Sequence, residues 1–226
     1  MTSTGLSHKR ILITQAESFM GPTLAKVFAA QGATVIADNR ELQDPLLPET
    51  LVEDAGIVDV LVVNLAVPAP TSLAVDVTDK EWQHTFSHLV DPLPRLCRAV
   101  LPQMLERETG KILLMGSASA LRGIRRASTY SAARGAQLAY VKSLAMEVAS
   151  KGVQVNAIAQ NFVDNPTYFP EEVQANPAFK ERLRREVPLG RLVSPEEDAQ
   201  FAAYLCSDAA DCFVGQVFPV CGGWVN

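Results

Sequence analysis

Short apolar runs alternate with segments of helical periodicity along this chain. Runs at residues 10–14 and 34–37 predict two parallel β-strands, and the spacing of Leu24, Val27 and Phe28 between them predicts an amphipathic helix. A strand–helix–strand opening of this kind is typical of nucleotide-binding α/β folds.

The same alternation continues to the end of the chain. Further apolar runs predict strands at residues 58–64, 112–115, 153–158 and 216–220, and Pro219 in the last of these suits a sheet edge. One helix is expected at 49–55 and another around Tyr130. A third begins at a capping box at 78–81, bends at Pro92 and Pro94 and ends at 108, and a fourth runs from a capping box at 194–197 to 209.

These elements predict an α/β protein with a Rossmann-like, doubly wound parallel sheet and helices on both faces. Only about twenty residues separate residue 38 from residue 59, which is too few for a complete helix–strand–helix. We therefore expect the strand after the second one to be missing or shortened. No repeat, low-complexity segment or linker interrupts residues 1–226, so a single domain is expected.

Composition excludes several classes of function. Of the 226 residues, 48% are hydrophobic and 20% are charged, which is typical of a globular domain with a substantial core. The net charge is −5 without a basic block, so nucleic-acid binding has no electrostatic support, and no apolar run is long enough to span a membrane. The four cysteines and three histidines are too scattered for a disulfide framework or a metal site. Because the N-terminal segment also lacks the apolar core of a secretory signal, a reducing cytoplasm is the expected compartment.

Three polar side chains follow the strand expected at 112–115. Ser117 stands at its carboxyl end, where α/β sheets bind ligands, and Tyr130 and Arg134 are four residues apart on the next helix. Residues at i and i+4 project from one helical face, and a fixed positive charge favours the phenolate form of a neighbouring tyrosine. The three are candidates for an oxygen-anchoring hydroxyl, a general base and its electrostatic activator, although such a trio also arises by chance in unrelated chains.

The first strand–helix turn lacks the glycines of a dinucleotide site. Such a site needs glycines so that the backbone can approach a pyrophosphate, and here only Gly21 remains. A carboxylate, Glu17, and a large ring, Phe19, lie where an anionic cofactor would fit. The alternative for Phe19 is that it is simply part of the core.

The order of motifs is similar to that of the short-chain dehydrogenase/reductase family over nearly the whole chain. The resemblance rests on Ser117 and Tyr130 and on the segments 156–159 (NAIA), 188–191 (PLGR) and 194–197 (SPEE) and a terminal glycine pair. The chain departs from that family at each place that touches the cofactor. Arg134 replaces the family's lysine, Gln160 and Asn161 replace a Pro-Gly pair, and Leu89 stands where many members have a proton-relaying asparagine.

Together these departures resemble the halohydrin dehalogenases, whose signatures are Thr-x4-Phe/Tyr-x-Gly and Ser-x12-Tyr-x3-Arg. The first reads here Thr14, Phe19 and Gly21, and the second reads Ser117, Tyr130 and Arg134. In that family a halide pocket occupies the space that nicotinamide fills in dehydrogenases. By position, the resemblance implies halide-binding walls formed by Phe19, Gln160, Asn161, Phe162, Val163 and Phe169.

The resemblance implies a reaction without a cofactor. Tyr130 removes the hydroxyl proton of a vicinal haloalcohol, and the alkoxide displaces the neighbouring halide to give an epoxide. Backbone N–H groups and aromatic edges at residues 160–163 are expected to stabilise the departing halide. In reverse, azide, cyanide or nitrite would open an epoxide. The resemblance further implies a homotetramer built on the helices at 80–106 and 128–150.

Two other functions stay open at this point. An oxidoreductase that uses NAD(P) finds its best support in Asp38, at the end of the second strand. A non-catalytic binding or regulatory relative is the other, because a fold does not by itself imply an activity.

Overall fold

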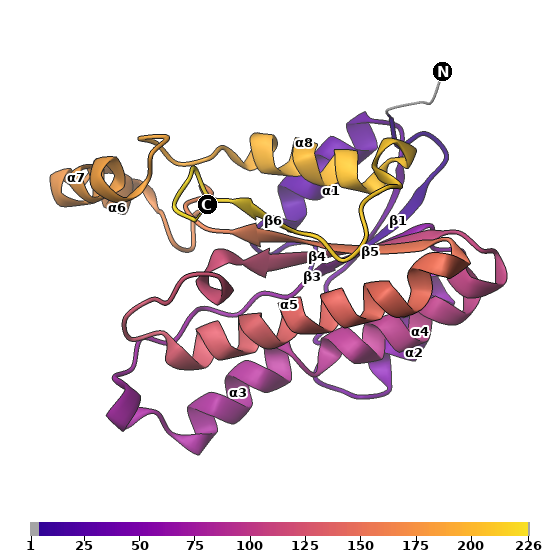
Figure 1. Ribbon diagram of the computed structural model, residues 1–226, viewed down its shortest axis with the longest axis horizontal. Coiled ribbons are helices and arrows are strands. Elements are labelled where there is room, and N and C mark those ends of the chain that lie inside the picture. Colours follow the sequence, from indigo (N-terminus) through magenta and orange to yellow (C-terminus); the bar gives the residue numbers. More distant parts are fainter. Residues whose placement is uncertain (1–4, 226) are drawn as a thin grey trace.

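A computed structural model describes residues 5–225 of the chain. Its centre is a parallel sheet with the strand order β2-β1-β3-β4-β5-β6 (Figure 1). The strands are β1 (Arg10–Thr14), β2 (Thr34–Asp38), β3 (Val60–Asn64), β4 (Gly110–Ser117), β5 (Val153–Gln160) and β6 (Val217–Val220). Every residue of β3 and β4 is buried, as expected for central strands of a parallel sheet that is covered on both faces.

Helices cover both faces of this sheet (Figure 1). One face carries α1 (Gly21–Ala30) and α8 (Pro195–Cys206), and the other carries α2 (Leu47–Ala55), α4 (Pro92–Glu106) and α5 (Ser128–Val148), with α3 (Asp79–Leu89) against α5. The expected doubly wound α/β fold is therefore confirmed. Among the described residues no helix is long and apolar enough to cross a membrane.

The edges of the sheet also follow the prediction. β2 is an edge strand, and only α2 lies between it and β3, so the strand that would extend the sheet beyond β2 is missing, as the short spacing predicted. At the other edge, β6 contains Pro219, whose missing N–H is tolerated there.

Several helix boundaries follow the capping residues. The Thr78 hydroxyl accepts a hydrogen bond from the Glu81 N–H at 3.1 Å, and Ser194 and Glu197 form a reciprocal capping box at the start of α8. α8 ends at Cys206, so the expected extension to 209 was wrong; a separate 3-10 turn, Asp208–Ala210, follows.

The helix expected to bend at Pro92 and Pro94 is in fact two helices. α3 ends at Leu89, and α4 begins at Pro92, which takes the first helical position, where its missing N–H costs nothing. Pro92 also has no N–H with which to continue the backbone hydrogen bonds of α3, which accounts for an interruption at this point. Pro102 lies inside α4, which nevertheless continues to Glu106.

The segment after β5 contains two helices that the apolar pattern did not predict. They are α6 (Glu171–Ala175) and α7 (Pro177–Glu186), and they extend beyond the carboxyl end of the sheet (Figure 1). Most of the residues of α7 are exposed, and its apolar side is narrow: Leu183 is buried, and Phe179 one turn earlier packs against the same hydrophobic cluster. These helices bring the loop at residues 161–170 over the carboxyl ends of the strands.

Candidate functional site

The carboxyl ends of four neighbouring strands meet at one edge of the sheet. β1, β3, β4 and β5 end at Thr14, Asn64, Ser117 and Gln160, and Ser117 pairs with Gln160 in the register. The strand order reverses between β1 and β3, and this is where open α/β sheets bind ligands. A cavity of about 380 Å³ opens at this place.

This cavity brings together all nine candidate site residues. Its lining includes Ser117, Tyr130, Arg134, Phe19, Gln160, Asn161, Phe162, Val163 and Phe169. It also includes residues to which the sequence assigned no role, namely Asn64, Ser119, Tyr168, Arg182 and Trp224. Residues more than 140 positions apart in the chain therefore share one concave surface, whose size suits a small organic molecule.

Ser117 is held at the mouth of β4 by its own turn. Its hydroxyl oxygen accepts from the Ser119 N–H at 3.2 Å and lies 2.9 Å from the Ser119 hydroxyl. Ser117 is buried, so an incoming hydroxyl group meets an oriented oxygen rather than a mobile surface side chain.

Tyr130 and Arg134 lie on one face of α5, as their spacing predicted. The guanidinium carbon of Arg134 is 5.1 Å from the centre of the Tyr130 ring, and both side chains are buried. The positive charge of Arg134 therefore lies beside the Tyr130 ring in the wall of the cavity.

Neutral oxygen atoms fix the guanidinium of Arg134. It donates to the Leu65 carbonyl at 3.1 Å, to the Met115 carbonyl at 3.3 Å and to the Gln137 side-chain oxygen at 3.0 Å, and Gln137 donates in turn to the Leu89 carbonyl. Its Nε has no hydrogen-bond partner among the described residues. Because none of these partners is a carboxylate, the positive charge of Arg134 remains available to an anion in the cavity.

Strained backbone places Phe19 in the cavity. Gln15 and Phe19 have φ values of +45° and +48°, a region that side chains other than glycine rarely adopt. The Asn64 amide donates to the carbonyls of Gln15 and Ser18 at 3.0 Å each, and the Gln15 side chain accepts from the Ala66 N–H at 2.6 Å. These bonds hold the turn so that the half-buried Phe19 ring lines the cavity, which favours a site role over the alternative of a plain core residue.

The halide candidates after β5 form an aromatic wall. The Phe162 ring lies 5.9 Å from that of Phe169 and 6.0 Å from that of Trp224, and the Arg182 guanidinium stands 5.5 Å over it. Ring edges carry partial positive charge, so such a wall can accept a polarisable anion. Val163 is buried beside them.

Two of the backbone N–H groups expected to meet a halide in this loop already have partners. The Asn161 N–H donates to the Val220 carbonyl at 3.1 Å, and the Phe162 N–H donates to the Asn161 side-chain oxygen at 2.8 Å. The positive φ of Phe162, +52°, accompanies that turn. Both backbone donors are used inside the protein, so an anion in this conformation meets side chains rather than these two N–H groups.

Gln160 reaches away from the loop to a buried carboxyl group. Its amide donates to Asp198 on α8, whose other oxygen has no partner among the described residues. Burial raises the pKa of Asp198 from 3.8 to about 7, and the hydrogen bond from Gln160 lowers it by less. The sequence pattern did not single out Asp198.

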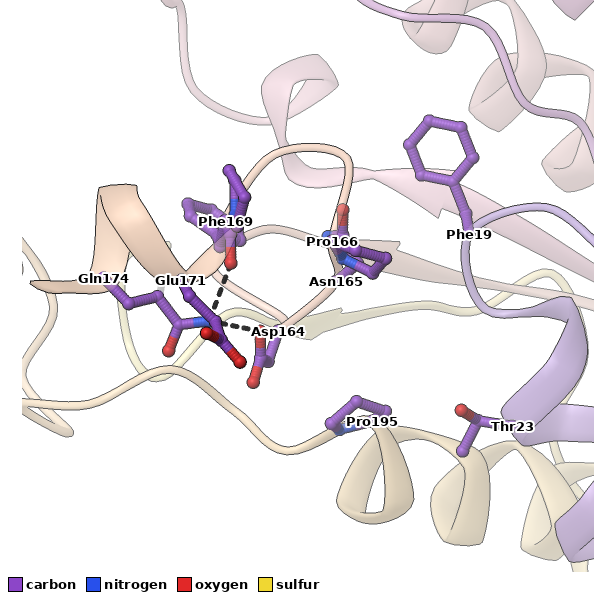
Figure 2. A pocket seen from close by; sticks show the side chains of 10 residues that line it. Phe19, Thr23, Asp164, Asn165, Pro166, Phe169, Glu171, Gln174 and Pro195 are labelled. Carbon is purple, nitrogen blue, oxygen red and sulfur yellow. Dashed lines mark hydrogen bonds between the residues drawn. The ribbon is translucent and has the colours of Figure 1, made fainter.

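The fold implies a place for dinucleotide phosphates at the start of α1, and the residues there do not fit them. A hollow at this place is lined by Phe19, Thr23, Asp164 and Glu171, with Gln174 bonded to Asp164 at 2.8 Å (Figure 2). The helix terminus favours an anion, but two carboxylates on the opposite wall repel one.

Close packing explains why one glycine of the turn remains. A Cβ added to Gly21 would lie 2.4 Å from the Ala16 carbonyl oxygen, so only glycine allows α1 to start so near the turn. Packing alone therefore requires glycine at position 21, whether or not a cofactor binds.

Asp38 lies at the end of β2, as expected, but its carboxylate is already paired. It accepts from the Arg40 side chain at 2.6 Å and from the Arg40 N–H at 3.0 Å. Arg40 also pairs with Asp54 at 2.8 Å. A ribose hydroxyl would have to compete with this ion pair for Asp38.

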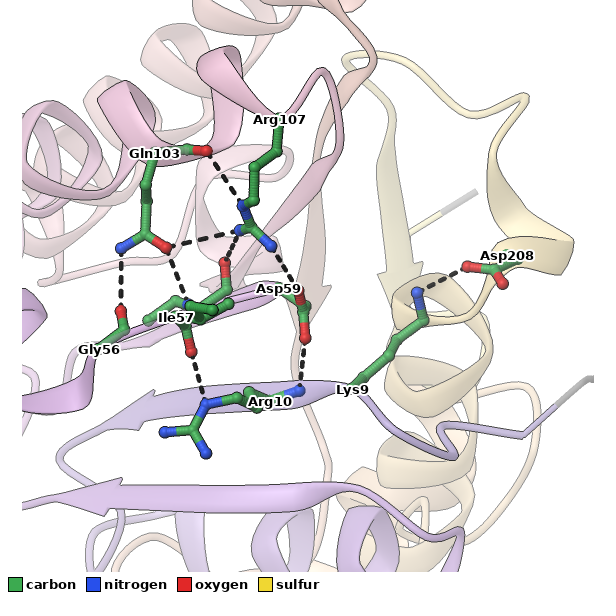
Figure 3. Close-up of polar contacts among 9 residues, drawn as sticks. Lys9, Arg10, Gly56, Ile57, Asp59, Gln103, Arg107 and Asp208 are labelled. Atoms are coloured by element: carbon green, nitrogen blue, oxygen red, sulfur yellow. Dashed lines mark hydrogen bonds and ion pairs between the residues drawn. The ribbon is translucent and has the colours of Figure 1, made fainter.

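A second polar cluster lies at the opposite end of the sheet (Figure 3). Asp59 accepts from the Arg10 N–H and from the Arg107 guanidinium, both at 2.8 Å, and Gln103 donates to the Gly56 carbonyl at 3.1 Å. These contacts tie α4 to the starts of β1 and β3, which is a structural role. Within residues 5–225, no three His, Cys, Asp or Glu side chains are grouped so that they could hold a metal ion.

Comparison with known proteins gives relatives along nearly the whole chain. Residues 46–225 match the family described as enoyl-(acyl carrier protein) reductase. The chain is 33% identical to a 2-keto-3-deoxy-L-fuconate dehydrogenase of Xanthomonas campestris, over 99% of this chain and 82% of that protein. It is 30% identical to the 3-oxoacyl-[acyl-carrier-protein] reductase FabG of Escherichia coli, over 95% of this chain and 96% of that protein.

Solved structures give two kinds of neighbour. One, named a dehalogenation enzyme, is 33% identical with a TM-score of 0.91 and covers 97% of this chain and 99% of its own. Another, the L-sorbose reductase of Gluconobacter frateurii complexed with NADPH and L-sorbose, is 26% identical with a TM-score of 0.89 and covers 98% of both chains. On the family match and on this coverage, the chain belongs to the short-chain dehydrogenase/reductase superfamily of enzymes.

Proposed function

We propose that this protein is a halohydrin dehalogenase, which converts vicinal haloalcohols to epoxides without a cofactor and opens epoxides with small anions in reverse. One observation carries the proposal: the Phe19 ring lines the same cavity as Ser117, Tyr130 and Arg134, in the turn where a dinucleotide needs bare backbone. The carboxylates around the start of α1 support it, because they repel phosphate.

The chemistry follows from the arrangement of the cavity. The substrate hydroxyl lies between Ser117 and Tyr130, and the Tyr130 oxygen, ionised beside Arg134, takes its proton. The alkoxide oxygen then attacks the neighbouring carbon and the carbon–halogen bond breaks, with its electron pair leaving on the halide. The aromatic wall of Phe162, Phe169 and Trp224 receives that anion.

A nicotinamide-dependent reductase or dehydrogenase is the second candidate. The names of the curated relatives favour it, since those given above are a dehydrogenase and a reductase. Arg40 beside Asp38 adds a cation that could face a ribose phosphate. The geometry at Phe19 and at the start of α1 opposes it.

The deciding experiment measures halide release from a panel of small bromo- and chloroalcohols by purified protein with no cofactor added. We expect turnover in the wild type and a loss of about 10²–10⁴-fold in Tyr130→Phe, because only the basic oxygen is removed. Tyr204→Phe is the matched control, since Tyr204 lies on α8 with its hydroxyl bonded to the Ala209 carbonyl at 3.3 Å. Reduction of ketones with added NADH or NADPH, without halide release, would favour the second candidate.

The homotetramer stays a proposal that rests on the resemblance. Trp82 on α3 and Met146 on α5 leave 43% and 78% of their surface exposed, and contact between copies would bury these apolar groups. Light scattering of the purified protein would test it.

A further inference from the structure

A second tyrosine, Tyr168, faces the same cavity as Tyr130. It lies on the loop between β5 and α6, and its ring packs at 5.4 Å against the ring of Phe19. The loop is pinned at this point, because the Asn165 side chain accepts from the Tyr168 N–H at 2.9 Å and the Asn165 carbonyl accepts from the Phe169 N–H at 2.9 Å. The position of the Tyr168 ring is therefore well defined.

The hydroxyl of Tyr168 is anchored through its oxygen rather than through its proton. The oxygen accepts from the Ala69 N–H at 3.0 Å, whereas its own O–H points to the Val67 carbonyl at 3.4 Å. Hydrogen bonds from a hydroxyl to oxygen are normally about 2.7–2.8 Å long, so the contact with Val67 is weak. The proton of Tyr168 is available to a better acceptor.

Tyr130 lines the same cavity as Tyr168, so an O–H that turns away from Val67 can face the Tyr130 side chain. Burial raises the pKa of Tyr168 well above its ordinary value, and charge on Tyr130 raises it further. Arg134 acts in the opposite direction with a smaller effect. Tyr168 therefore keeps its proton to a higher pH than an ordinary tyrosine does.

We propose that Tyr168 is a positioning residue that donates a hydrogen bond to the ionised oxygen of Tyr130 and so shares with Arg134 the stabilisation of the phenolate. Its O–H turns from the Val67 carbonyl to the Tyr130 oxygen once Tyr130 has ionised. No proton leaves Tyr168 in this step, since the proton of Tyr130 passes to solvent and the phenolate later accepts the substrate's proton. The kinetic part of this inference rests on the proposed dehalogenase activity, whereas the ionisation of Tyr130 does not.

The first test needs no substrate. Phenolate absorbance is titrated against pH for the wild type, Tyr130→Phe, Tyr168→Phe and the control Tyr204→Phe. We expect one early-ionising tyrosine that disappears in Tyr130→Phe and is unchanged in Tyr204→Phe. In Tyr168→Phe its ionisation should move about one to two pH units higher, the size expected for a hydrogen bond to a charged group.

A second variant separates the hydroxyl from the ring. Tyr168→Leu removes both, and it should shift the ionisation of Tyr130 as far as Tyr168→Phe does if the hydroxyl alone matters. An early titration that stays at the wild-type pH in both variants would overturn the proposal, and so would a wild-type titration that coincides with that of Tyr130→Phe.

The kinetic test uses halide release. In Tyr168→Phe the rising limb of kcat/KM against pH should move to higher pH by the same one to two units as the absorbance titration. At high pH, activity should return to within a few fold of the wild type. Loss of activity at every pH without a shift would assign Tyr168 a merely structural role. Absence of halide release in the wild type would reject the dehalogenase function, while the absorbance titration would still decide the inference about Tyr168.

Discussion

Replacing the buried carboxyl group of Asp198 by an amide should change how the stability of this protein depends on pH. Asp198 is fully buried on the inner face of α8, with the Gln160 amide on one oxygen and no partner on the other among the described residues. Burial raises its pKa from 3.8 to about 7. Below about pH 4 the group is protonated in both the folded and the unfolded chain, so it costs no stability there.

Stability is lost as the pH rises from about 4 to about 7. Over this range the unfolded chain ionises Asp198 and the folded protein does not, and above about pH 7 the cost is constant. At about 1.36 kcal/mol per pKa unit, the free energy of unfolding of the wild type falls by up to about 4 kcal/mol through this one group. Asp198→Asn still accepts from Gln160 but does not ionise, so its free energy of unfolding should lack this contribution.

Urea denaturation at a series of pH values between about 4 and 8 measures the effect. The amide of the variant buries an N–H without an acceptor, which costs about 1–3 kcal/mol at every pH and changes the offset between the curves but not their slopes. Asp208→Asn is the control, because Lys9 lowers the pKa of that exposed carboxyl group and its contribution is instead lost as the pH falls. If the curves of the wild type and Asp198→Asn are parallel from about pH 4 to 7, the assignment is refuted.

Three further predictions concern the cavity and the hollow at the start of α1. Arg134→Lys keeps the charge but loses the planar fork that contacts the Leu65 and Met115 carbonyls and Gln137. We therefore expect lower activity and a pH–rate profile whose rising limb lies at higher pH. An unchanged profile would mean that Arg134 does not tune Tyr130. Chloride and bromide should inhibit haloalcohol turnover competitively, and this inhibition should weaken when Phe162 is replaced by alanine. Noncompetitive inhibition would place the halide elsewhere. NADH, NAD, NADPH and NADP should show no micromolar binding in calorimetry, because carboxylates line the phosphate hollow; a micromolar Kd for any of them would favour the oxidoreductase.

The sequence by itself determined the elements whose signal is local. Strands buried on both faces appear as continuous apolar runs, and the expected ranges of β1, β2 and β5 lie within the observed strands or equal them. The caps at Thr78 and Ser194 were predicted because a capping box needs only residues within one helical turn. The common face of Tyr130 and Arg134 followed from helical geometry for the same reason.

Some helices and helix boundaries were not predicted correctly. α7 is largely exposed, and its narrow apolar side at Phe179 and Leu183 was missed in a segment expected to be a loop. The break between α3 and α4 was missed as well, and there Pro92 lacks the N–H that would continue the hydrogen bonds of α3. Helix ends such as Cys206 are set by packing of the final turn, which the local sequence describes poorly.

Only the tertiary structure decided which distant groups meet. Tyr168 packs against Phe19, Asp198 binds Gln160, and Asn64 holds the turn that carries Phe19, and each of these contacts joins segments that are far apart in the chain. The spacing of residues along a sequence fixes neighbours within a helix or a turn, but it carries no information on how loops from different strands converge. Sheet topology brings the carboxyl ends of the strands to one edge, and the burial that results sets the charge state of Asp198 and leaves the charge of Arg134 free of a carboxylate partner.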